Sequence, residues 1–505
     1  MNKFLSFCVV VLFATSVHSQ IILNEAFIKN NFVEVGVNTF GAYGTQTPAP
    51  VSYHPRPNST GTARNLGFVA DPDQDGWDVG THNYFGDFFY PGQQQEGFSI
   101  QMNGSVFHNW TSNSLPQILG DNISITTTTG ITEAVWQGTK NGLLVKQKTI
   151  IPQSDVFFII RVELTNTTTT TMNNVYYMRT LDPDNDVTLS NIYQTLNEIV
   201  YTLPNSVNST LVSAKGLIYT NCYLGLGTKD CRAKPFIVTS ELNPMPSHLI
   251  SGIHNQSNGS YYTYTGSITG DVGIGLTFSV GDIEPGQTKR IALAYVLKES
   301  DLDVALAQTL PEINLEGTPI VTGAAYNICE SNVVNLEVSN GEDYVWQWEP
   351  EELFSSPTGD NVSLTIPNVT TTITVTGQSD CNPISYSFTV VPSTYEASIE
   401  PENHIICSGT STSYNPLQGV TSSSSTIEWY DSAVGGILLS SSPNFVTPVL
   451  TNTTTEPLDY IYYYQEITSV GCTSERIPFT VTVYETLDLS NKELKSCASG
   501  GNTSV

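Results

Sequence analysis

The chain has little positive charge and few charged residues of either sign. Only 13% of its 505 residues are charged, and 19 Lys and Arg stand against 47 Asp and Glu, for a net charge of −28. A surface this acidic repels the phosphates of nucleic acids and of anionic membranes, so we expect neither as a partner. The same surface suits divalent cations and keeps an exported protein soluble.

Long apolar runs are equally scarce. The first, Phe4–Ala14, follows Lys3 and precedes Val17-His18-Ser19. This order of charged, apolar and small residues is typical of a secretory signal, and it predicts cleavage after Ser19. No other stretch of about 18 uncharged apolar residues occurs, so we expect no direct membrane span. The chain is therefore predicted to be exported, to the cell surface or beyond it.

Sequence motifs of the common enzyme classes are absent. The chain contains no G-x-S-x-G, no H-E-x-x-H and no Walker loop, and its histidines are scattered. We therefore expect a protein that is not an enzyme. One alternative stays open, a secreted carbohydrate-active enzyme with accessory modules. Carboxylate pairs are set by the fold, and His82 and His108 with Glu96 would supply a mutarotase-type site.

Helical periodicity is rare, and Glu299–Gln308 is the nearest case. Thr, Ser, Asn, Gly and Tyr are abundant instead. β-Branched and aromatic residues favour strands, while Asn, Gly and Pro favour the turns between them. The pattern predicts an all-β protein, with a large N-terminal β-sandwich or supersandwich followed by tandem immunoglobulin-like sandwiches.

The C-terminal part of the chain repeats. Phe388–Ser413 and Phe479–Ser504 each run from an alternating strand through Tyr-Glu to Cys and a tract of small residues. Cys329, Cys407 and Cys497 open these repeats about 80 to 90 residues apart, the size of an immunoglobulin-like sandwich. The domains predicted are a signal peptide (1–19), a large β-rich domain (20–315), two immunoglobulin-like domains (316–394 and 395–484) and the start of a third (485–505). We expect the chain to be part of a longer protein.

Seven cysteines follow the signal segment, and an exported protein is expected to pair them. Sequence order predicts the disulfides Cys222–Cys231, Cys329–Cys381 and Cys407–Cys472, and leaves the partner of Cys497 beyond the end. The last two pairs enclose Trp346, Trp348 and Trp429. A Cys–Trp–Cys order predicts an indole packed against a disulfide between the two sheets.

Ile427–Val483 resembles the immunoglobulin-like repeat of giant surface proteins of the Bacteroidetes. The shared elements are Trp429-Tyr430, Gly435-Gly436, Tyr463-Tyr464 with Gln465, and Gly471-Cys472. The resemblance covers about residues 320–505. It implies export by the type IX secretion system and a role like that of gliding-motility adhesins, with secretion and motility machinery at the cell surface as partners.

Two Asp-rich segments predict calcium sites. The first holds Asp71, Asp73, Asp75 and Asp78 around Gly76, and the second holds Asp182, Asp184 and Asp186. Alternating carboxylates converge on one hard cation, and Gly allows the tight turn. An EF-hand would need Glu at the twelfth position, where His82 stands. The alternative is a pair of turns in which Asp side chains cap the backbone.

An aromatic segment, Trp77–Tyr90, follows the first Asp cluster. Its Trp77, His82, Tyr84 and Tyr90 are the candidate ligand-binding residues, because aromatic rings stack on sugars. The alternative is that these rings form an edge of the core. The whole pattern predicts a cell-surface adhesin, in which an N-terminal tip binds an extracellular glycan or other surface ligand on an immunoglobulin-like stalk.

Overall fold

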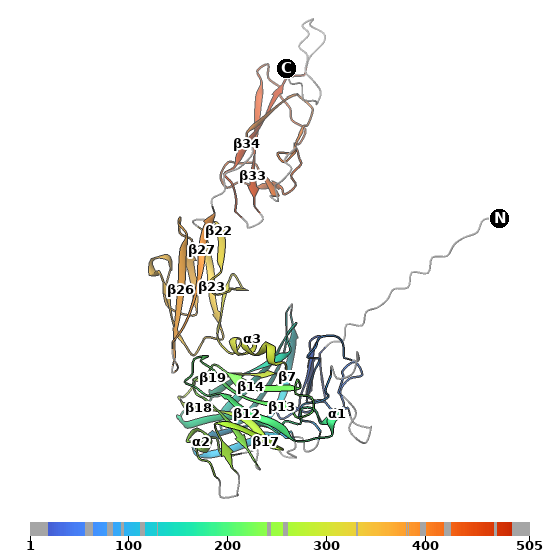
Figure 1. The fold of residues 1–505 in the computed structure, drawn as a ribbon. Helices are drawn as coiled ribbons and strands as arrows, with labels where there is room; N and C mark the ends of the chain where they lie inside the picture. The colour runs from blue at the N-terminus through green and yellow to red at the C-terminus, as the bar shows by residue number, and fades with distance from the viewer. Residues whose placement is uncertain are drawn as a thin grey trace, which may run out of the picture. The chain divides into compact units, whose positions relative to one another are not determined.

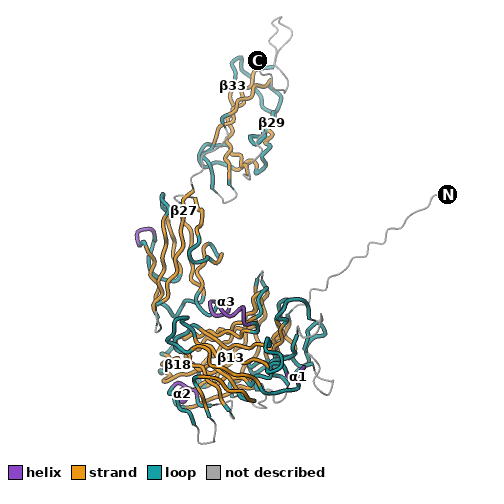
Figure 2. Tube along the Cα trace, in the orientation of Figure 1, coloured by secondary structure: helices purple, strands orange, loops and turns teal. Residues whose placement is uncertain are grey.

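A computed structural model describes residues 19–486 except 56–63, 78–83, 92–94, 112–116, 129, 240–243, 256–260, 330–331, 380, 382, 394–399, 419–425 and 469–471. Strands dominate and the few helices are short, which confirms the all-β prediction (Figure 2). The chain forms two compact units. The first contains Met1–Glu312 with the turns Asn340–Asp343 and Ser379–Asn382, and the second contains the remainder.

The described residues of the first unit form three sheets (Figure 1). Their strand orders are β1-β2-β3-β4, β17-β12-β13-β14-β19-β10-β9-β8-β7 and β16-β15-β18-β11-β5-β6. The strands are β1 Gln20–Ile22, β2 Glu25–Lys29, β3 Val33–Val37, β4 Phe68–Ala70, β5 Glu96–Met102, β6 Ser105–Trp110, β7 Leu119–Thr127, β8 Ile131–Lys140, β9 Leu143–Pro152, β10 Phe157–Asn166, β11 Met172–Leu181, β12 Thr195–Tyr201, β13 Thr210–Gly216, β14 Tyr223–Thr228, β15 Ala233–Val238, β16 Tyr262–Thr263, β17 Gly266–Gly270, β18 Gly273–Ile283 and β19 Thr288–Val296. The helices are α1 Val187–Ser190, α2 Pro246–Ile250, η1 Glu299–Asp301 and α3 Leu302–Ala307.

One apolar core joins the three sheets of the first unit. It takes side chains from each sheet, among them Val35, Tyr177 and Leu293. Its strands alternate as a half-buried sheet requires, and β9 shows this most clearly. Asn166 closes the turn between β10 and β11 by donating to the carbonyl of Thr170 at 2.8 Å. The helical periodicity of Glu299–Gln308 corresponds to the short helices η1 and α3.

A buried ion pair lies inside this core. Arg179 and Glu96 are 1% and 0% exposed, and the Arg179 Nη2–Glu96 Oε2 distance is 2.9 Å. The Tyr295 hydroxyl and the Tyr43 backbone N–H also donate to Glu96, at 2.8 and 2.6 Å. Arg179 Nη1 donates to Gln147 at 3.0 Å. A buried charge is tolerated only when an opposite charge and hydrogen bonds of this kind compensate for its lost hydration.

The second unit contains two sandwiches in sequence. The first, called module 1, has the sheets β21-β20-β23-β25 and β22-β27-β26-β24; the second, module 2, has β28-β34-β33-β30-β31 and β29-β32. Their elements are β20 Glu312–Leu315, β21 Thr318–Pro319, β22 Ala325–Cys329, β23 Val333–Ser339, β24 Val345–Glu349, η2 Glu351–Leu353, β25 Asn361–Thr365, β26 Thr371–Gln378, β27 Ile384–Ser393, β28 Glu402–Cys407, β29 Ser413–Tyr414, β30 Thr426–Tyr430, β31 Leu438–Ser440, β32 Phe445–Val446, β33 Leu458–Ile467 and β34 Ile477–Tyr484.

The two modules share a plan. In each, an early strand that ends in cysteine pairs parallel with the last strand: β22 with β27, and β28 with β34. Trp346 and Trp348 are buried in the core of module 1, and Trp429 is buried in that of module 2. The predicted packing of indoles in the sandwich cores is therefore present, although the disulfides expected beside them are not.

Candidate functional site

The first Asp-rich segment forms a turn closed by the protein's own backbone. Asp71 is 1% exposed, and its carboxylate accepts hydrogen bonds from the N–H groups of Gln74 at 3.1 Å and Gly76 at 3.0 Å. Asp73 and Asp75 are exposed, and Asp78 lies outside the described residues. Asp71 thus caps its own turn, as the alternative interpretation expects. Calcium binding by this segment stays a prediction.

In the second Asp-rich segment, the three carboxylates have different roles. Asp186 accepts from Ser190 Oγ at 2.8 Å and from the Tyr219 N–H at 3.0 Å, so it fixes the loop around α1. Asp182 and Asp184 differ, because one buried oxygen of each, Oδ1, has no hydrogen-bond partner among the described residues. The same is true of Asn185 Oδ1. Three buried acceptors without donors therefore lie within four residues, and buried acceptors are normally satisfied.

These carboxyl groups also repel each other. Burial, followed by the charge of Asp271, raises the pKa of Asp182 to about 7. Burial, followed by the charges of Asp182, Asp271 and Asp87, raises the pKa of Asp184 to about 9. Asp271 reaches the cluster because it lies just before β18, whose Ile274 pairs with Leu181 of β11. The spacing of Asp182, Asp184 and Asp186 in the sequence gives no sign of this fourth carboxylate.

Among the described Asp, Glu, His and Cys side chains, one group of three is compact enough to surround a metal: Asp230, Cys231 and Cys381. Its two sulfurs form a disulfide, so the group is a covalent link rather than a metal site. The carboxylate oxygens of Asp182, Asp184 and Asp271 are farther apart than the ligand atoms of that group, which lie within 4.8 Å of one another. A cation there would therefore need the Asn185 oxygen, main-chain carbonyls or water as further ligands.

The aromatic segment belongs mainly to the core. Tyr84 is 6% exposed, and Phe85, Phe88 and Phe89 are all buried. Tyr90 is half-buried, and its hydroxyl donates to the carbonyl of Thr45 at 2.7 Å. His82 lies outside the described residues. Tyr84 therefore lies at an edge of the core, as the alternative interpretation expects, and ligand contact by Tyr84 stays a prediction.

Trp77 is the aromatic residue of this segment that lines a pocket. Its ring stacks on His54 at 4.5 Å, and its Nε1 donates to the carbonyl of Asn31 at 3.2 Å. The pocket measures about 370 Å³ and is also lined by Ser19, Lys29, Asn30, Asn31, Thr127, Thr132 and Gln153. Amide, hydroxyl and ammonium groups around one indole suit a polar ligand with an apolar face.

Glu96, which the sequence offers to an enzyme hypothesis, is committed to the core. It pairs with Arg179 and is fully buried, while burial lowers the pKa of His108. His108 Nδ1 lies 2.6 Å from Ser99 Oγ. The Glu96 carboxylate is held by an arginine and closed to solvent, which does not suit a base that must reach a substrate. His82 lies outside the described residues, so the enzyme alternative stays open.

The disulfides differ from all three predicted pairs. The bonds are Cys231–Cys381, within the first unit, and Cys329–Cys472, within the second. Cys222 is buried with its Sγ directed to the carbonyl of Asn185 at 3.1 Å. Cys407 is not bonded to Cys472, since Cys472 is taken by Cys329.

The predicted pairs fail for one geometric reason. In the sheet of module 1, Cys329 at the end of β22 lies opposite Ser393 at the end of the neighbouring strand β27. Cys381 instead precedes the start of β27. Ten residues of strand place those two ends about 30 Å apart, whereas a disulfide needs Cα atoms within about 7 Å. Cys407 and Cys472 lie in the same way at opposite ends of β34, and Cys222 and Cys231 at opposite ends of β14.

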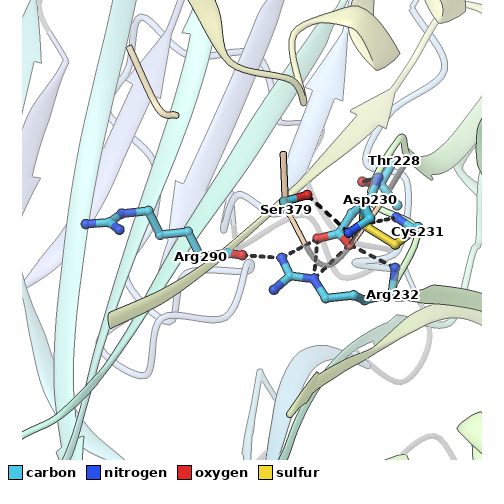
Figure 3. Close-up of a disulfide and its surroundings, with 7 residues drawn as sticks. Thr228, Asp230, Cys231, Arg232, Arg290 and Ser379 are labelled. Carbon is cyan, nitrogen blue, oxygen red and sulfur yellow. Dashed lines mark hydrogen bonds and ion pairs between the residues drawn. A yellow bond between two sulfur atoms is a disulfide. The ribbon is translucent and has the colours of Figure 1, made fainter. Parts of the chain in front are cut away.

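The Cys231–Cys381 bond lies in a polar setting (Figure 3). The Arg232 guanidinium forms a fork on the Asp230 carboxylate, with an Nη2–Oδ2 distance of 2.6 Å, and also donates to the carbonyl of Arg290. Arg290 in turn binds Asp343 through Nη1 at 3.2 Å. The Cys231 N–H donates to Cys381 Sγ at 3.2 Å. Two turns of the first unit, Asn340–Asp343 and Ser379–Asn382, are therefore anchored beside the disulfide.

Comparison with known proteins identifies one module. Residues 392–484 match the family described as Ig-like domain, CHU_C associated, a type of Ig domain found in secreted proteins of the Bacteroidetes. No curated protein matches the chain. No described helix is long and apolar enough to cross a membrane.

Solved structures resemble the chain only distantly. A polysaccharide lyase is 11% identical with a TM-score of 0.22, covering 60% of this chain and 40% of its own. A bacterial glucoamylase complexed with acarbose is 12% identical with a TM-score of 0.27, covering 44% and 30%. Immunoglobulin domains 1–5 of Sidekick-1 are 7% identical with a TM-score of 0.20, covering 77% and 93%. Similarities this low carry no argument about function.

Proposed function

We propose that this protein is a cell-surface adhesin, in which the first unit binds an extracellular ligand and the immunoglobulin-like modules act as its stalk. The observation that carries the proposal is the organisation of the chain: a large β-rich unit, then two sandwiches built on one plan, one of which matches an Ig-like family. The order of a secretory signal at the N-terminus and the acidic surface agree with a role outside the cell. Type IX secretion and a link to gliding machinery belong to the same proposal.

The pocket beside Trp77 is the proposed binding site, and its ligand class is an extracellular glycan. An indole offers an apolar face for the C–H groups of a sugar ring, and Asn31, Gln153 and Thr132 offer hydrogen bonds to its hydroxyls. Ser19 forms part of the same wall. Cleavage after Ser19, as the sequence predicts, would remove that residue and widen the pocket.

A glycan array followed by calorimetry on the full chain tests this proposal. We expect binding that Trp77→Ala weakens at least tenfold, and that Tyr193→Ala leaves unchanged. Tyr193 is a matched control because it is 41% exposed in the same unit and does not line the pocket. If the two variants bind the glycan with equal affinity, the pocket beside Trp77 is not the binding site. Turnover of a polysaccharide by the chain would favour the enzyme alternative.

We also propose that a divalent cation, calcium, stabilises the first unit at Asp182 and Asp184. The support is chemical: two carboxylate oxygens and the Asn185 amide oxygen are buried without donors, and the charges that act on Asp182 and Asp184 are all negative. A hard cation would satisfy these oxygens and remove their repulsion. The site differs from the sequence prediction by losing Asp186 and gaining Asp271.

A further inference from the structure

The two disulfides found among the described residues interleave along the chain. In sequence order the bonded residues are Cys231, Cys329, Cys381 and Cys472. The first residue is bonded to the third and the second to the fourth, so the second bond begins inside the loop that the first bond closes. The bonds close loops of 150 and 143 residues that overlap between Cys329 and Cys381. Every peptide bond from Cys231 to Cys472 is therefore spanned by at least one disulfide.

The cysteines occupy equivalent places in the two modules. Cys381 lies in the turn between β26 and β27, and Cys472 lies in the turn between β33 and β34. In each module this turn precedes the last strand of the sheet, and its cysteine bonds to a segment of chain that comes before the module. Cys329 and Cys407 likewise share a place, at the end of the strand that pairs parallel with the last one.

From this connectivity we infer that the chain from Cys231 to Cys472 is a doubly connected segment, which a single backbone cut does not divide. The segment includes 394–399, which joins module 1 to module 2, and the Glu316-Gly317 turn between β20 and β21. Three separate intradomain disulfides, as the sequence order predicts, would leave both of these connections open to one cut by an extracellular endoprotease. The inference concerns the covalent chain and does not depend on what the first unit binds.

Tryptic digestion of the unsubstituted chain, denatured but not reduced, provides the first test. Lys and Arg are absent between Lys298 and Arg476, while Lys229 and Arg232 flank Cys231 closely. Trypsin acting on the denatured, unreduced protein should therefore leave the tripeptide Asp230-Cys231-Arg232 attached to the fragment 299–476. A reducing agent should release it. Free tripeptide before reduction would overturn the first bond and the inference with it.

Site-specific cleavage provides the second test. A thrombin site is inserted either between Tyr395 and Glu396 or between Glu316 and Gly317, and the cut chains are run on denaturing gels without reductant. We expect one band in both cases, and two bands after reduction. The matched control is a site between Ser206 and Val207, before Cys231, where one cut should give two bands without reductant. Separation at either of the first two sites would refute the inference.

Cysteine variants assign each protected connection to one bond. Cys472→Ser should let the chain cut after Tyr395 fall apart without reductant, while Cys231→Ser should not. For the site after Glu316 the dependence should reverse, because only Cys231–Cys381 spans it. If a variant fails to fold, the tryptic tripeptide and the two insertions in the unsubstituted chain still decide the outcome.

Discussion

Removing the guanidinium from the buried ion pair tests how the first unit is held together. Arg179→Met would delete the fork on Glu96, the donor to Gln147 and the contact of the guanidinium with the Tyr43 ring, whose centroid lies 4.4 Å away. The Glu96 carboxylate would keep the Tyr43 N–H and the Tyr295 hydroxyl as donors, but no positive charge. Breaking a buried pair in this way costs about 3–5 kcal/mol of unfolding free energy.

The pH dependence of this loss has a definite sign. Burial already raises the pKa of Glu96, and the charge of Arg179 opposes that rise. Without Arg179 the folded variant would bind a proton that the unfolded chain has released, so its stability should fall as the pH rises above the unfolded pKa of about 4.3. The difference from the unsubstituted protein should therefore be largest at neutral pH and smaller near pH 4.

Urea unfolding of the full chain at pH 4.5 and pH 7.5 measures both effects. Lys215→Met is the matched control, since its partner Glu299 lies at 2.8 Å but is 61% exposed, and an exposed pair contributes about 0–1 kcal/mol. The double variant Glu96→Gln/Arg179→Met should regain part of the loss, because no unpaired charge is left buried. Equal destabilisation by Arg179→Met and Lys215→Met would refute the reasoning.

Three further predictions concern the carboxylates and the module cores. With a chelator present, the melting temperature of the first unit should fall as the pH rises from about 4 toward 9, because folded Asp182 and Asp184, with pKa values of about 7 and 9, hold protons that the unfolded chain loses. Calcium should flatten this dependence of melting temperature on pH, and Asp184→Asn should reduce it. If calorimetry shows the same pH dependence with and without calcium, the cation proposal is contradicted. Trp429→Ala should destabilise module 2 by about 3–5 kcal/mol, since the indole is fully buried; a loss below about 1 kcal/mol in urea unfolding would show that its packing contributes little. Gly377→Ala should lower the melting temperature of module 1, because its Cβ would come within 2.6 Å of the Trp346 ring, and an unchanged melting temperature would show that the ring can move aside.

The sequence by itself determined what depends on neighbouring residues. Rare helical periodicity, with β-branched and aromatic residues separated by Asn, Gly and Pro, predicted strands and turns, because these preferences act within a few residues. Trp429 with the Gly435-Gly436 turn identified an immunoglobulin-like module, which the match over residues 392–484 confirms. The repeat of cysteine positions was equally visible, since Cys329 and Cys407 close equivalent strands.

Only the tertiary structure decided which distant groups meet. Cysteines that are close in sequence, such as Cys329 and Cys381, lie at opposite ends of one strand, so their sulfurs find partners elsewhere in the chain. Glu96 meets Arg179 across 83 residues, and Asp271 joins Asp182 only because β11 pairs with β18. The ends of an extended strand lie far apart, and pairing between strands brings residues that are distant in sequence close together. Sequence spacing alone therefore gives neither the separation of the cysteines nor the approach of the charged groups.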